Sequence, residues 1–175
     1  MKTKSLFFCA VVGLAATGML SAADATANVN ERTEVTFLNP EKFADVRDAY
    51  MGSDKGRDAL LDQLRDYIVQ RAKSYVPAGQ TLSITVTDVD LAGDFEPWRG
   101  PQTADVRIVK DIYPPKIDLE FKVTAADGSV VKEGKRQLRD LAFMMKISIN
   151  RDDSLHFEKA LIDDWFRADF QRVKS

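Results

Sequence analysis

The sequence is poor in the side chains that most often carry chemistry, because its 175 residues include one cysteine and one histidine. Cys9 lies in an N-terminal segment that we expect to be removed, so the remaining chain would have no disulfide, thiol nucleophile or thiolate metal ligand. His156 lies beside the start of a predicted helix, where a protonated imidazole is disfavoured, and we interpret it as a surface residue. Cysteine-based catalysis is therefore excluded, and a Ser-His-Asp triad would have to use His156.

Several familiar motifs are also absent. The sequence has no Gly-rich phosphate loop, no His-Glu-x-x-His and no Gly-x-Ser-x-Gly. After the N-terminal segment, no run approaches the roughly 18 apolar residues of a membrane span. Loss of Lys2, Lys4 and Asp24 with that segment would change the net charge from −2 to −3. A mildly acidic, mixed surface gives no reason to expect binding to nucleic acid or anionic lipid.

The N-terminal segment has the three parts of a secretory signal. Lys2 and Lys4 are followed by an apolar run over 6–20 and by small residues up to Ala25. We predict a signal peptide over 1–25, a flexible tether over 26–33 and a single domain over 34–173. An exported domain without disulfides is typical of the periplasm of a Gram-negative bacterium. Lipidation of Cys9 is disfavoured, since Phe7 and Phe8 precede it and the apolar run continues beyond it.

Hydrophobic periodicity predicts an α+β domain. The pattern indicates strands at 35–38, 81–86, 106–109, 117–123 and 130–138, a short helix from Pro40 to Gly52, and longer helices over 55–75 and from Asp153 or Ser154 to about Arg172. Residues 139–150 fit either a helical turn or a strand. The simplest packing is a two-layer sandwich, with a mostly antiparallel or mixed sheet of four to five strands and helices on one face.

The richest polar stretch runs from Asp88 to Arg99. Near Thr87 the alternation changes phase, so either the strand bulges there or Asp88 and Asp90 point inward. The acids of this stretch are a candidate Ca²⁺ site, but their spacing is not that of an EF-hand, and we favour structural hydrogen bonds or ion pairs. Our candidate binding residues are Asp88, Asp90, Asp94, Glu96, Trp98 and Arg99. We interpret Trp98 as a lid on the core; if exposed, it would be the best contact residue of the chain.

Two charges fall on the apolar faces of predicted helices. Arg71 lies at the edge of the apolar arc of helix 55–75, and Glu158 lies beside Trp165 on the last helix. A buried charge needs a partner, so we predict that Glu158 meets Arg71 or, as second choice, a backbone amide. Arg71 has Asp88 and Asp90 as alternatives. The competing interpretations are that Glu158 serves the helix dipole and that the Arg71 head reaches water.

Four stretches resemble a bacterial family known as domain of unknown function 3016. They are Val35-Thr36-Phe37 with Asn39-Pro40 and Phe43-x-Asp45-Val46-Arg47; Pro77-x-Gly79-Gln80-x-Leu82; Thr87-Asp88-Val89-Asp90-Leu91-Ala92-Gly93; and Phe157-Glu158-Lys159 with Asp164-Trp165-Phe166. The resemblance implies an exported single-domain protein of Gram-negative bacteria and assigns no catalytic residue.

The sequence therefore favours a periplasmic, non-catalytic protein that binds a partner or assists envelope assembly. Its partner would be an envelope protein or a small ligand, and we predict no cofactor and no metal. The alternative is a metal-assisted hydrolase that uses carboxylates around Asp88, Asp90 and Asp94. The two hypotheses differ in whether these carboxylates converge in an open cleft or are held in hydrogen bonds and ion pairs.

Overall fold

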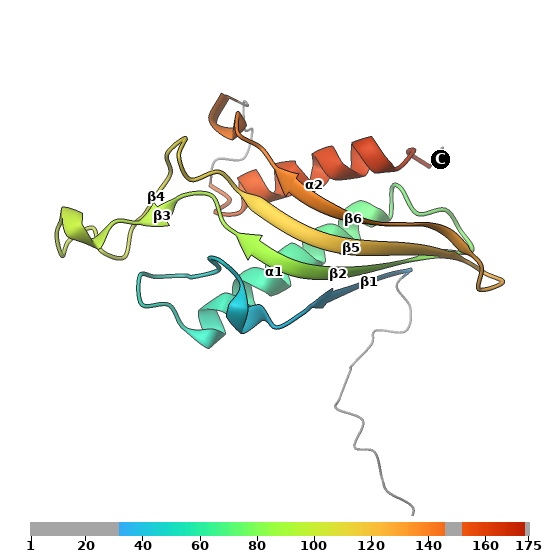
Figure 1. Ribbon diagram of the computed structural model, residues 1–175, viewed down its shortest axis with the longest axis horizontal. Helices are drawn as coiled ribbons and strands as arrows, with labels where there is room; N and C mark the ends of the chain where they lie inside the picture. The colour runs from blue at the N-terminus through green and yellow to red at the C-terminus, as the bar shows by residue number, and fades with distance from the viewer. Residues whose placement is uncertain (1–31, 146–151, 174–175) are drawn as a thin grey trace, which may run out of the picture.

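The computed structural model describes residues 32–145 and 152–173, and they form a two-layer α+β fold (Figure 1). The predicted signal peptide and most of the predicted tether lie outside the described residues. The strands are β1 (Thr33–Phe37), β2 (Gln80–Asp90), β3 (Asp94–Phe95), β4 (Arg107–Ile108), β5 (Lys116–Ala125) and β6 (Val130–Arg139); the α-helices are α1 (Asp54–Ala72) and α2 (His156–Asp169). Three short 3₁₀ turns complete the set: η1 (Pro40–Lys42), η2 (Pro97–Arg99) and η3 (Phe143–Met145).

The main sheet is mixed, with the order β1-β2-β5-β6. β1 pairs parallel with β2, and the two other pairings are antiparallel. Both helices pack on one face of this sheet, and in the view of Figure 1 the strands lie in front of α1. β3 and β4 form a separate small antiparallel ribbon. This confirms the predicted α+β architecture with helices on one side.

Alternating side chains bury one face of the sheet against the helices. Ile84 of β2 lies opposite Phe121 of β5, and both are buried. Phe121 contacts the Trp165 ring of α2 edge-on, with ring centroids 5.6 Å apart. The β5–β6 hairpin turns at Gly128, whose φ of 86° favours glycine, as its Asp-Gly signal predicted.

The predicted helix over 55–75 is present as α1. Ser53 is its N-cap and accepts a hydrogen bond from the Gly56 amide at 2.9 Å. Its buried side chains recur at helical spacing: Leu61, Leu64, Ile68 and Ala72. The helix is therefore held by one apolar stripe.

The predicted helix from Pro40 to Gly52 is wrong. Asn39 is in the left-handed region with φ of 52°, and only the single turn η1 follows. The chain then runs beside the end of β2, where Asp45 forms a parallel bridge with Asp90. Pairing with the sheet satisfies the Asp45 backbone, whose amide donates to Val89 O at 3.1 Å. Tertiary hydrogen bonds have replaced the local helix that the spacing favoured.

The last helix is shorter than predicted and begins without a side-chain cap. α2 ends at Asp169, and its N-cap residue is Leu155. Asp153 instead accepts from the Leu155 amide at 3.0 Å and pairs with Lys159, so it orders the turn before the helix. The ambiguous segment 139–150 contains η3, and its residues 146–150 lie outside the described residues.

Candidate functional site

A β-bulge at the end of β2 gives the candidate site its geometry. The register of β2 with β5 shifts between Val86 and Asp88. Of the two predicted alternatives, a bulge near Thr87 is therefore confirmed. Val89 consequently returns to the core, and Asp88 and Asp90 lie on the helix-free face. The aspartates do not point into the core.

Four charged residues form one row across this end of the sheet. The backbone of Asp45 is bridged to Asp90. In the strand register, Asp90 lies opposite Lys116, and Lys116 lies opposite Arg139. Residues directly opposite one another in a sheet point to the same face. The row therefore lies on the helix-free face and carries two anions followed by two cations, a pattern that required the tertiary pairing of four separate segments.

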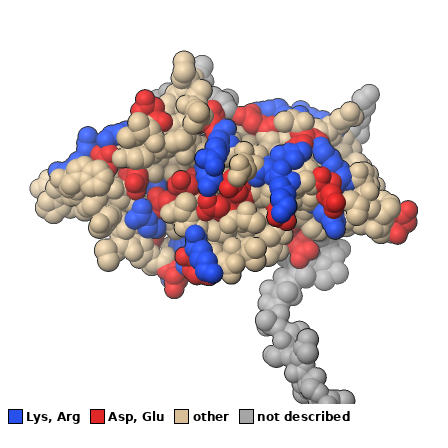
Figure 2. Space-filling model, in the orientation of Figure 1, with Lys and Arg blue, Asp and Glu red and all other residues tan. Residues whose placement is uncertain are grey.

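A cavity of about 290 Å³ opens over this row. Its charged lining residues are Asp45, Arg47, Asp90, Asp94, Lys116 and Arg139, and Ile112, Pro114, Pro115 and Leu141 add apolar walls. In Figure 2, which keeps the orientation of Figure 1, acidic side chains gather near the middle of the face with basic ones around them. The site thus combines both signs of charge with an apolar rim.

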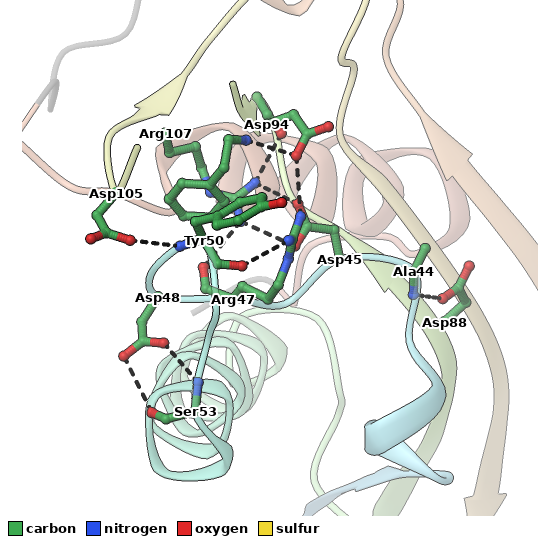
Figure 3. Close-up of polar contacts among 12 residues, drawn as sticks. Ala44, Asp45, Arg47, Asp48, Tyr50, Ser53, Asp88, Asp94, Asp105 and Arg107 are labelled. Atoms are coloured by element: carbon green, nitrogen blue, oxygen red, sulfur yellow. Dashed lines mark hydrogen bonds and ion pairs between the residues drawn. The ribbon is translucent and has the colours of Figure 1, made fainter. Parts of the chain in front are cut away.

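One wall of the cavity is a fixed ion-pair cluster. Asp45, which is 7% exposed, accepts hydrogen bonds from Arg47 Nε at 2.8 Å and Arg107 Nη1 at 2.9 Å. Arg47 also reaches Asp94 at 3.1 Å, so it lies between two carboxylates (Figure 3). Burial alone would raise the pKa of Asp45, but the two guanidinium groups outweigh it and hold that pKa below its usual value.

Gly93 lets the β3–β4 ribbon approach this cluster. Its φ is +82°, and a Cβ there would lie 2.8 Å from the Ile108 carbonyl oxygen. Arg107 Nη1 donates to the Gly93 carbonyl at 2.9 Å. Only glycine meets both requirements, since a side chain would clash with backbone and be strained.

The predicted acids of the stretch have different environments. Asp88 pairs with Lys116 Nζ at 2.7 Å and accepts the Ala44 amide at 2.8 Å. Glu96 is 2% exposed and is bound by Lys110, Arg99 and Tyr113. The hydrogen bond from Lys110 is the main reason that the pKa of Glu96 is lowered. Asp94 is paired with Arg47, so three of the four predicted acids are held in ion pairs: Asp88, Asp94 and Glu96.

Asp90 is the exception. Its side chain makes no hydrogen bond or ion pair with any residue that the structure describes, although it lines the cavity. Burial, with the negative charges of Asp45 and Asp88, raises its pKa. Among the described residues, no group of three or more His, Cys, Asp or Glu is placed to hold a metal ion.

The prediction that Trp98 covers the core is wrong. It lies in η2 at the far end of the β3–β4 ribbon and is 71% exposed. This turn extends beyond the short ribbon, away from the main sheet (Figure 1). The ion pair between Glu96 and Lys110 holds the two sides of the turn together. Trp98 therefore remains a candidate contact residue, and Arg99 beside it is tied to Glu96 at 2.7 Å.

The predicted Glu158–Arg71 pair is wrong, but the second choice for Glu158 is confirmed. Glu158 is 1% exposed and accepts the Ala92 amide at 2.7 Å. Arg71 reaches neither Asp88 nor Asp90; its Nε lies 2.7 Å from Asp163, which is five residues after Glu158 on α2. The error is one of helix register, which the periodicity of a single helix does not fix.

Trp165 is buried in an aromatic group rather than placed at the cavity. Its ring contacts Phe121, Phe166 and Phe170, with centroids 4.7–5.6 Å apart. Its indole Nε1 has no hydrogen-bond partner among the described residues. Its role is to pack α2 on the sheet.

Sequence reasoning missed Asp45, Arg47, Arg107 and Arg139 as members of the site. Asp45 and Arg47 stand in a stretch that resembled the family, which was the available signal. Arg107 and Arg139 had none, because their place depends on the ribbon and on the β5–β6 register.

Three further findings bear on function. No helix within the described residues is long and apolar enough to cross a membrane. A family model described as "Protein of unknown function (DUF3016)" matches residues 31–168. No curated protein matches the chain.

Proposed function

This chain belongs to the DUF3016 family, and we propose that it is an exported periplasmic protein that binds another protein of the cell envelope without catalysing a reaction. Export rests on the signal-like segment 1–25, which lies outside the described residues. The binding role rests on the exposed end of the fold.

The observation that carries the proposal is a group of exposed apolar side chains on the β3–β4 ribbon and on the 43–53 loop that is hydrogen-bonded to it. We call this group the tip surface; it consists of Tyr50, Met51, Trp98, Val106 and Val109. The Tyr50 amide donates to Asp105 at 3.1 Å, which joins the 43–53 loop to the ribbon (Figure 3). Tryptophan, tyrosine and methionine are enriched at protein interfaces, and tryptophan and tyrosine at binding hot spots.

The ion pairs behind the tip surface support a binding role over a hydrolytic one. A metal-assisted hydrolase needs carboxylates that converge in an open cleft, whereas Asp88, Asp94 and Glu96 are each engaged by a cation. The Arg47–Asp94 and Arg107–Asp45 ion pairs hold the ribbon on the 43–53 loop, which is bridged to β2 at Asp90. A fixed ribbon presents Trp98 at a lower entropic cost of binding.

The test is site-specific photo-crosslinking in living cells. A photoreactive phenylalanine analogue at position 98 or 106 should give a discrete adduct of higher mass. Position 131 is the matched control, because Val131 and Val106 are both 53% exposed and Val131 lies near the opposite end of the sheet. Absence of adducts at 98 and 106, or equal adducts at 131, would refute the tip surface as the binding site.

A further inference from the structure

The cavity over the charged row has two unsatisfied charges of opposite sign. Neither Asp90 nor Arg139 makes a side-chain hydrogen bond or ion pair with any residue that the structure describes, and both line the cavity. The other charges of the row are satisfied: Asp45 by Arg47 and Arg107, and Lys116 by Asp88. Among the described residues, the cavity lining therefore has one acid and one base without a hydrogen-bond or ion-pair partner.

Lys116 separates these two charges in the row and attracts Asp90 through space, but it makes no hydrogen bond or ion pair with either of them. Its ammonium lies 2.7 Å from Asp88 and 3.5 Å from Asp118, which oppose each other one pair beyond Val89 and Ile117. The lysine head is thus drawn towards the middle of the sheet. Its stem is left between Asp90 and Arg139 as part of the cavity floor.

The spacing of the two free charges sets the size of a bound molecule. Asp90 and Arg139 are on β2 and β6 with β5 between them, so their backbones are about 10 Å apart, or two strand spacings. Both side chains line the same cavity of about 290 Å³, so a molecule that contacts both must be small and must carry charges of both signs.

The cavity walls indicate what lies between the two ends. Ile112, Pro114, Pro115 and Leu141 offer apolar contacts, and Ile112 and Leu141 are exposed at the rim. An aliphatic side chain would cover them and remove apolar surface from water. The cavity volume of about 290 Å³ is near the lower limit for small-molecule sites.

We propose that this cavity binds a free α-amino acid with an aliphatic side chain, its ammonium group on Asp90 and its carboxylate on Arg139. Arg139 matches a carboxylate because guanidinium donates two parallel hydrogen bonds. The ammonium would also offset the burial of Asp90 and its repulsion by Asp45 and Asp88, which together raise the pKa of Asp90. This proposal does not require the protein partner, since the tip surface shares no residue with the cavity.

Three related probes test the two ends separately: L-leucine, L-leucinamide, which lacks the carboxylate, and N-acetyl-L-leucine, which lacks the ammonium. Titration of the purified protein by NMR should move the amides of Asp90, Gly93 and Lys116 with L-leucine. Each of the other two probes should bind at least about tenfold more weakly than L-leucine, which is the loss expected for one charge-assisted hydrogen bond.

Two variants complete the test. Asp90→Asn should weaken L-leucine and L-leucinamide but leave N-acetyl-L-leucine unchanged. Arg139→Gln should weaken L-leucine and N-acetyl-L-leucine but leave L-leucinamide unchanged. Asp66→Asn and Arg172→Gln remove the same charges at exposed positions outside the cavity lining and should bind all three probes as the wild type does.

The proposal is overturned if millimolar L-leucine moves no cavity amide, or if the three probes bind equally. It is also overturned if Arg139→Gln weakens L-leucinamide as much as L-leucine, because Arg139 would then not be the contact of the carboxylate. Arg139 is exposed, so its substitution leaves the core intact even if Asp90→Asn folds poorly. Absence of L-leucine binding together with adducts at position 98 would leave the partner surface standing and remove only the amino-acid site.

Discussion

Glu158 is the most completely buried acid of the described residues. Its Oε1 accepts the Ala92 amide, and its Oε2 has no partner among the described residues. Burial raises its pKa, and the hydrogen bond from Ala92 opposes that rise only in part. This hydrogen bond joins α2 to the turn between β2 and β3. We therefore expect Glu158 to stabilise the fold mainly by accepting the buried Ala92 amide.

Substitutions at Glu158 should separate this hydrogen bond from the charge. Glu158→Ala leaves a buried amide unpaired and a cavity behind, and should lower the free energy of unfolding by about 2–4 kcal/mol. Glu158→Gln retains an acceptor for Ala92 and should stay within about 1 kcal/mol of wild type. Denaturant unfolding at pH 7 measures both.

A wild-type midpoint for Glu158→Ala would show that the Ala92 amide does not depend on Glu158. The control is Arg71→Ala, because Arg71 pairs with Asp163 and shares no partner with Glu158. The two losses should therefore add in the double variant. The pairing predicted from sequence would instead have made the double loss much smaller than the sum.

At the scale of elements, the C-terminal end of α2 is attached to β6 by one acid. Asp169 accepts from Arg136 Nε at 2.8 Å and pairs with Lys132 at 3.0 Å. An acid is unfavourable at a helix C-terminus, so the two cations must outweigh the dipole. Chiefly through the Arg136 hydrogen bond, the pKa of Asp169 is lowered to about 2.

Loss of this attachment should depend on pH. Because the folded-state pKa of Asp169 is below its unfolded value, its contribution is present above about pH 4 and is lost as the pH falls towards 2. Asp169→Asn should therefore cost about 1–2 kcal/mol at pH 7, allowing for solvent screening, and almost nothing near pH 2.

Unfolding curves of wild type and Asp169→Asn across this range measure the difference. Asp66→Asn, at an exposed position on α1, should show no such gap at any pH. A gap that is constant with pH would mean that Asp169 acts through packing rather than charge.

At the scale of the whole molecule, we expect the exported chain to begin at Thr26. Lys2 and Lys4, the apolar run and Ala23-x-Ala25 support cleavage after Ala25, with Asp24 as the near alternative first residue. N-terminal sequencing of the protein from a periplasmic extract decides between them. An intact Met1 in a soluble cytoplasmic fraction would contradict export.

The arrangement of layers explains why the tip surface and the cavity lie at one end. β2 is the longest strand of the sheet, and the chain leaves its end at Leu91 to build the β3–β4 ribbon before it returns as β5. The 43–53 loop joins the same end through the Asp45–Asp90 bridge. Loops gathered at one end of a rigid sheet are a common place for binding sites.

The sequence by itself determined the elements whose periodicity agrees with their packing. The stripe of α1, the alternation of β2 and β5 and the Asp-Gly turn each follow from local spacing, as did the bulge near Thr87 as one of two alternatives. The burial of Glu158 was also readable, since its angular position among apolar residues is a property of one helix. These features need no knowledge of a second element.

Only the tertiary structure decided which residues meet. The segment 43–50 has helical spacing, but pairing of Asp45 with the end of β2 satisfied its backbone better than a helix would. Trp98 is exposed because the ion pairs of Glu96 hold its turn away from the sheet. Asp90 and Arg139 face one cavity because of the registers of two strand pairs. Long-range contacts of this kind depend on the relative placement of whole elements, and local periodicity carries no information about that placement.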